Sequence, residues 1–284
     1  MTDRRTRQPD GSIEATQALA LRLAIGAALL TFGLSLYARS LDLLRTDIPL
    51  RASNGRLFWL ASVIGVIGFG FAVDHFTGRI ASTGSVVTPR PDLAASSAAI
   101  LPALVVFAAL QLVAWDSRFA VALSASLLAG AGVFTAIVVR HYLLSGDPAV
   151  FSGARLVQMS LTAAVGFLSL SLARGWMAGT LYTLVVVMVI AGLLLFQAFD
   201  GVRAFPIRRA AYALAAGVVL AEVAVALSYW PPLGWHGGAI VATVFVVLML
   251  TIDAILTRSV SSDLVARYAG AGVGVCGLLV FLAR

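Results

Sequence analysis

Long apolar runs of about 20 residues, separated by short polar connections, recur along the whole chain. A helix of about 20 apolar residues spans the roughly 30 Å hydrocarbon core of a bilayer. We therefore predict an all-α polytopic membrane bundle of about nine transmembrane helices. The predicted spans cover residues 17–37, 57–76, 92–115, 117–140, 153–173, 176–199, 207–230, 237–257 and 264–283.

The chain divides into a polar N-terminal segment and an apolar remainder. Residues 1–16 are predicted to form a disordered tail, and residues 17–284 a single transmembrane domain. The first apolar run, 17–37, resembles a signal peptide by position. It is too long, carries Arg22 and lacks a convincing cleavage site, so an uncleaved helix is favoured. Whether this run spans the bilayer or lies as a re-entrant or interfacial segment stays open.

Composition narrows the classes of protein further. About 60% of the 284 residues are hydrophobic and 12% are charged, and nine crossings leave no room for a soluble domain. All 20 basic residues are arginine, which excludes a retinal or pyridoxal Schiff base and a P-loop lysine. The net charge of +7 does not indicate nucleic-acid binding, because the arginines lie mostly between apolar runs.

The distribution of arginine and tryptophan predicts an orientation. If the first run spans, twelve arginines fall on the side of the N-terminus, here called side A, and seven on the opposite side B. The positive-inside rule then predicts a cytoplasmic N-terminus and an outside C-terminus. Tryptophan favours the membrane interface, and all five fall at span ends on side B: Trp59, Trp115, Trp176, Trp230 and Trp235.

Glu222 is the acidic residue whose burial most needs an explanation, because it lies close to the centre of the 207–230 run. An ionised carboxylate in hydrocarbon costs a few kcal/mol. Thr183 and Thr243 lie at similar depth on neighbouring spans and are candidate donors to it. The three residues form either a proton or ion site, or a hydrogen-bonded contact between helices.

A second group of polar residues lies near side A. It comprises Asp74, His75, Arg140, His141, Asp253 and Arg267. Asp253 and Arg267 lie on consecutive antiparallel spans at the same depth, so a buried ion pair between them is one expectation. A polar vestibule for an anion or another substrate is the other.

Sequence motifs for catalysis are missing. We expect no metal site and no cofactor, because the three histidines lie on different connections and Cys276 is the single cysteine. No zinc-protease, aspartate-rich or serine-elbow motif occurs. Gly272, Gly274 and Gly277 match a dinucleotide pattern, but they lie within an apolar run and fit helix packing better.

The stretch AEVAVALSYWPPLGWHGGAI, residues 221–240, resembles the C-terminal part of a bacterial multi-pass membrane family known as a domain of unknown function. The resemblance implies a bacterial inner-membrane protein and assigns no activity.

Two classes of function remain. The first is a structural or accessory membrane subunit without catalytic activity, and the second is a small-molecule or ion transporter that uses the intramembrane Glu222. The expected partners are the lipid bilayer and either a membrane protein partner or further copies of the chain, with no nucleic acid.

Overall fold

The computed structural model describes residues 10–40, 53–83, 98–115, 118–145, 148–173, 180–200, 202, 206–229, 234–257 and 261–282. These residues form an up-and-down bundle of α-helices in which no strand occurs. The helices are α1 (Asp10–Ser40), α2 (Ser53–Thr83), α4 (Ile100–Trp115), α5 (Phe119–Ser145), α6 (Pro148–Ala173), α7 (Thr180–Ala198), α8 (Pro206–Ser228), α9 (Gly234–Leu256) and α10 (Ser262–Leu282).

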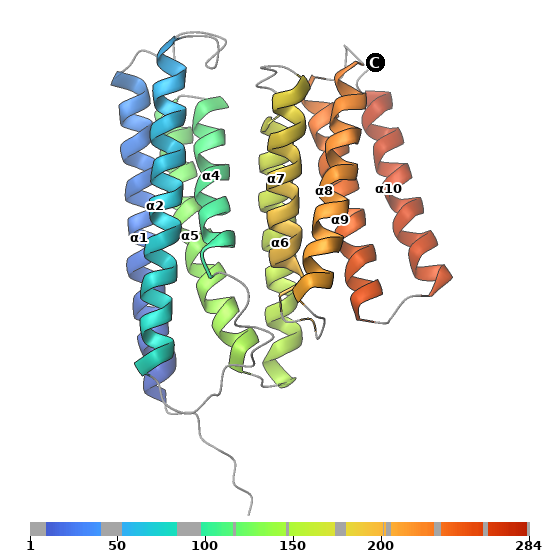
Figure 1. Cartoon of the computed structure of the whole chain (residues 1–284). Coiled ribbons are helices and arrows are strands. Elements are labelled where there is room, and N and C mark those ends of the chain that lie inside the picture. The colour runs from blue at the N-terminus through green and yellow to red at the C-terminus, as the bar shows by residue number, and fades with distance from the viewer. Residues whose placement is uncertain are drawn as a thin grey trace, which may run out of the picture.

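The prediction of an all-α polytopic bundle is confirmed. Within the described residues, seven helices are long and apolar enough to cross a membrane, and the two apolar helices α4 and α7 are shorter. Each predicted span overlaps one helix of the structure, and the predicted span residues 92–97 and 176–179 lie outside the described part of the chain. Consecutive helices run in opposite directions, so α1 begins at the lower end of the bundle in Figure 1 and α10 ends at the upper end.

The first helix is longer than predicted. It begins at Asp10, so residues 10–16, which we assigned to a disordered tail, belong to α1. Thr16 explains the extension, because it is buried and its hydroxyl lies 3.3 Å from Nδ1 of His141 on α5. Residues 1–9 lie outside the described part of the chain.

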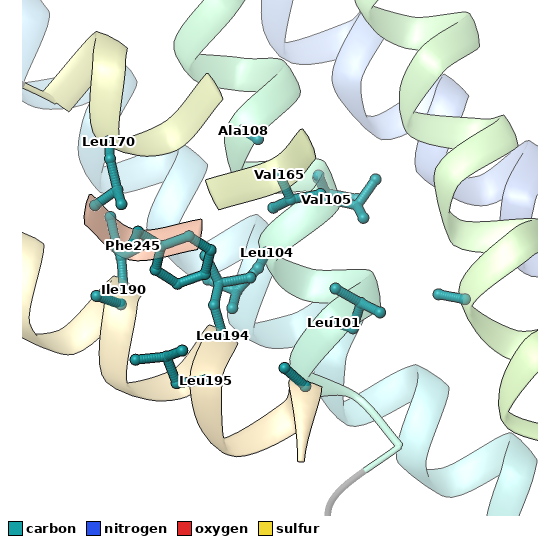
Figure 2. Packing of buried hydrophobic residues seen from close by; sticks show 14 of the residues in the cluster. Leu101, Leu104, Val105, Ala108, Val165, Leu170, Ile190, Leu194, Leu195 and Phe245 are labelled. Atoms are coloured by element: carbon teal, nitrogen blue, oxygen red, sulfur yellow. The ribbon is translucent and has the colours of Figure 1, made fainter. Parts of the chain in front are cut away.

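The core joins two groups of helices. In Figure 1, α1, α2, α4 and α5 stand on one side, and α6 to α10 on the other. Figure 2 shows side chains of α4, among them Leu104 and Ala108, facing the side chains of α6, α7 and α9. Phe245 of α9 is fully buried there. It fits because position 166 on α6 is glycine: an added Cβ would lie 2.5 Å from the Phe245 ring.

Small residues bring α7 and α8 close together. A Cβ added to Gly217 of α8 would lie 2.8 Å from the carbonyl oxygen of Met188 on α7. Close backbone approach of this kind is common between membrane helices, where small residues form the interface. This contact fixes the rotation of α8 about its axis, and that rotation decides which of its residues face outward.

Candidate functional site

The most extensive polar contacts in the described residues lie at the lower end of the bundle, where α7 turns into α8. Two arginines bind Asp200 there: Nη1 of Arg140 from α5 lies 3.1 Å from Oδ2, and Nη1 of Arg209 from α8 lies 3.1 Å from Oδ1. Arg209 has an exposed fraction of 0%. Asp200 therefore connects three helices through charge-assisted hydrogen bonds.

The end of α7 explains why a cation is buried at this point. The last carbonyl groups of a helix lack partners within the helix and carry partial negative charge. Arg209 donates to the carbonyl oxygen of Phe199, 3.2 Å away, and its guanidinium lies 5.6 Å from the centre of the Phe196 ring. Because α8 begins at Pro206, Arg209 lies in its first turn and reaches the end of α7 directly.

Two buried glutamines extend this contact to α6. Nε2 of Gln158 on α6 donates to the carbonyl oxygen of Gln197, 2.7 Å away, and thereby satisfies another end carbonyl of α7. Nε2 of Gln197 lies 3.4 Å from Oδ2 of Asp200. We call the five residues Arg140, Gln158, Gln197, Asp200 and Arg209 the Asp200 cluster. The cluster ties α5, α6, α7 and α8 together at one level.

The predicted ion pair between Asp253 and Arg267 is wrong. Asp253 of α9 pairs with Arg155 of α6 instead, and both side chains are largely buried. Arg267 of α10 is 80% exposed and lies 3.7 Å from Asp263 of the same helix. The reason is that α10 turns Arg267 away from α9, whereas α6 and α9 pack side by side.

The structure brings together only some of the remaining residues of the predicted side A group. Arg140 joins the Asp200 cluster, and Asp74 on α2 is exposed but close enough to act electrostatically on Arg140. His75 is exposed, with its ring 5.6 Å from that of Phe76. His141 contacts Thr16 of α1. In the described residues, then, Asp74 lies near Arg140, whereas His75 and His141 make other contacts.

The predicted contact of Glu222 with Thr183 and Thr243 is also wrong. Glu222 is exposed on the outer face of α8 and makes no hydrogen bond or ion pair with any described residue. Thr183 is buried on α7, and the Thr243 hydroxyl donates to the carbonyl oxygen of Ala239 within α9, 2.8 Å away. The buried face of α8 carries Leu220 and Ala224, and Glu222 lies roughly 160° around the helix from each of them.

Asp200 and Arg209 were not predicted as site residues, although the sequence carries a signal for them. Asp200 lies nine residues before Arg209, on the short connection between two predicted spans. Opposite charges at the facing ends of two consecutive antiparallel helices come close by topology alone. Attention to charges at span ends on one connection would have found this pair.

The fold defines the class of protein: an all-α polytopic helix bundle with helices long and apolar enough to cross a membrane, whose polar side chains near one end of the bundle form contacts between helices. The model of a family described as a protein of unknown function, DUF5656, matches residues 38–282, and the chain belongs to this family. The match confirms that the chain belongs to a family of unknown function, as the resemblance in residues 221–240 implied. Comparison with curated proteins and with solved structures found no match.

Proposed function

We propose that this protein is a structural or accessory subunit of a membrane assembly, without catalytic activity. One contrast supports the proposal: the polar groups that face into the bundle have partners within the chain, whereas a polar group that faces outward has none among the described residues. The inward-facing charges are paired across helices, because the half-buried Arg140 and the buried Arg209 both bind the buried Asp200. Glu222, in contrast, faces outward from a membrane-length helix and has no partner among the described residues.

The position of Glu222 calls for a partner outside this chain. It lies five residues before the end of the candidate span Pro206–Leu227, or about 8 Å inside it. A carboxyl group that faces hydrocarbon at this depth is costly unless it finds a hydrogen-bond donor. Its surroundings on the outer face of α8 are apolar, with Val218 and Val219 exposed one turn away. A transmembrane helix of another protein, carrying a donor at this depth, would satisfy it.

The transporter alternative finds less support. It requires Glu222 to line a path through the bundle, and the side chain is on the outside. The Asp200 cluster supports the accessory role instead, because its charged groups hold helix ends together. In the same proposal the membrane is a bacterial cytoplasmic membrane, with the N-terminus in the cytoplasm and the C-terminus outside, as the arginine distribution favours.

Native mass spectrometry of the protein, gently extracted from its own membrane, tests this function. We expect a second protein in fixed stoichiometry with the wild-type chain. Glu222→Gln should retain this partner because an amide still accepts a hydrogen bond, whereas Glu222→Leu should lose it. Val219→Leu, which enlarges an exposed apolar residue on the same face, serves as the matched control and should retain it. A wild-type particle that carries only copies of this chain, or a reproducible small molecule, would refute the accessory role.

A further inference from the structure

The last helix is the least covered membrane-length helix in the described residues. Only 6% of the most apolar part of α10 is buried, against 28 to 44% in the other six candidate spans. It stands at the edge of the bundle and packs on α9 (Figure 1). Gly272 marks the side that faces α9, because a Cβ added there would lie 2.7 Å from the Val247 side chain. The opposite side of α10 faces away from the molecule.

That outer side carries a regular pattern. Its residues recur at alternating steps of four and three, the spacing of a seam between two packed helices. Each member is exposed, and a Cβ added to any of its three glycines would have no neighbour within 4 Å. We call this set the α10 stripe: Asp263, Arg267, Gly270, Gly274, Gly277 and Phe281.

The charges of the α10 stripe are balanced within it. Asp263 and Arg267 occupy its first two positions, at exposed fractions of 84% and 80%, with 3.7 Å between Oδ2 and Nη2. Two copies that share one membrane orientation and a two-fold axis along the membrane normal have parallel α10 helices. Asp263 and Arg267 then lie about one helical turn, roughly 6 Å, apart along the axis of each copy, so each arginine can also reach the carboxylate of the other copy.

We infer that the α10 stripe is the interface for a second copy of this chain. The three glycines let the two α10 backbones approach closely at the centre of the contact. Phe281 packs at one end, and the four alternating charges of the two copies lie at the other. A stripe with one cation and one anion at adjacent positions complements itself, whereas a partner with one sign of charge would leave a like-charge contact. This contact is separate from the one at Glu222, which lies on α8.

Single-molecule photobleaching in lipid bilayers tests the interface, using the full chain with a fluorescent protein fused at its N-terminus. We expect two-step bleaching that gives way to one-step bleaching as the protein is diluted in lipid. Gly274→Leu should weaken the dimer by about tenfold or more, because it separates the backbones. Ala269→Leu adds the same side chain at an exposed position off the stripe and should leave the dimer intact. One-step bleaching of the wild type at every density, or equal effects of the two variants, would overturn the inference.

Charge reversal gives a second test that leaves the glycines unchanged. Both side chains are exposed, so their replacement does not disturb the fold. Arg267→Asp gives a stripe with two anions, Asp263→Arg one with two cations, and each should dimerise less than the wild type. A mixture of the two variants, labelled with different fluorophores, should form mixed pairs above the level of either variant alone. Absence of such pairs, or a photo-crosslinker at Phe281 that captures a different protein in native membranes, would also overturn the inference.

Discussion

Asp200 shows how one carboxylate can organise several helices. It accepts from Arg140 and Arg209, and the Arg209 side chain is fully buried. A buried charge that loses its partner is far more costly than a buried pair, because the remaining ion has neither water nor a counter-charge. The stability of the lower end of the bundle should therefore depend on Asp200 more than on the exposed charges.

Asp200→Ala should lower the free energy of unfolding by about 3–5 kcal/mol, the usual cost of removing one member of a buried ion pair. Asp263→Ala removes a pair whose two side chains are at least four-fifths exposed and should cost at most about 1 kcal/mol in the monomer. Denaturant unfolding in detergent micelles measures both. Combining Asp200→Ala with Arg140→Leu and Arg209→Leu should recover much of the loss, and no recovery would contradict a purely structural role for the cluster.

The sequence could predict how deep a residue lies along its helix, but not which way that residue faces. The depth of Glu222 follows from its place in an apolar run. The rotation of α8 about its own axis does not follow from the sequence, because α8 is apolar nearly all round and has no polar face to orient it. Likewise, Arg155 and Arg267 both lie near the depth of Asp253, and only the packing of α6 on α9 selects Arg155. The spans were predictable because bilayer thickness fixes helix length independently of packing.

At the scale of the element, glycine positions determine which helix faces meet. Gly217 allows α8 to approach the backbone of α7, and Gly166 accommodates the ring of Phe245. Gly26 of α1, by contrast, has no atom within 4 Å of an added Cβ. The helix sequence alone does not distinguish these glycines, since both kinds lie in similar apolar surroundings.

Gly217→Ala should destabilise the bundle by about 1–3 kcal/mol, because the added methyl group meets the Met188 carbonyl and forces the helices apart. Gly26→Ala makes the same chemical change in open space. There it should be neutral or stabilising by up to about 1 kcal/mol through helix propensity. Thermal unfolding in the same detergent compares the two variants, and equal shifts would contradict the close α7–α8 contact.

At the scale of the whole molecule, nine described helices place the start of α1 and the end of α10 at opposite ends of the bundle. The family match begins at residue 38, so most of α1 lies before it. Even so, α1 packs closely on α5: a Cβ added to Gly130 would lie 3.0 Å from the carbonyl oxygen of Ala24. This close packing favours a first apolar run that spans with the others.

Reporter fusions in a bacterial host test that topology. Alkaline phosphatase fused after Arg284 should be active, because it folds only outside the cytoplasm, and green fluorescent protein at the same position should be dark. Deleting residues 10–40 while keeping a start codon should reverse both results if α1 spans. Unchanged reporters in the deleted protein would show that the first helix does not cross.

The short chain distance between Asp200 and Arg209 also bears on how the protein is made. The two residues are nine positions apart, so their ion pair can close as soon as α7 and the start of α8 have left the ribosome. Neither charge then needs to enter the bilayer alone, and α7 and α8 can insert as one neutralised hairpin. Arg140 on α5 is synthesised 60 residues before Asp200. It is therefore already in the membrane when the hairpin inserts, and it can then bind Asp200.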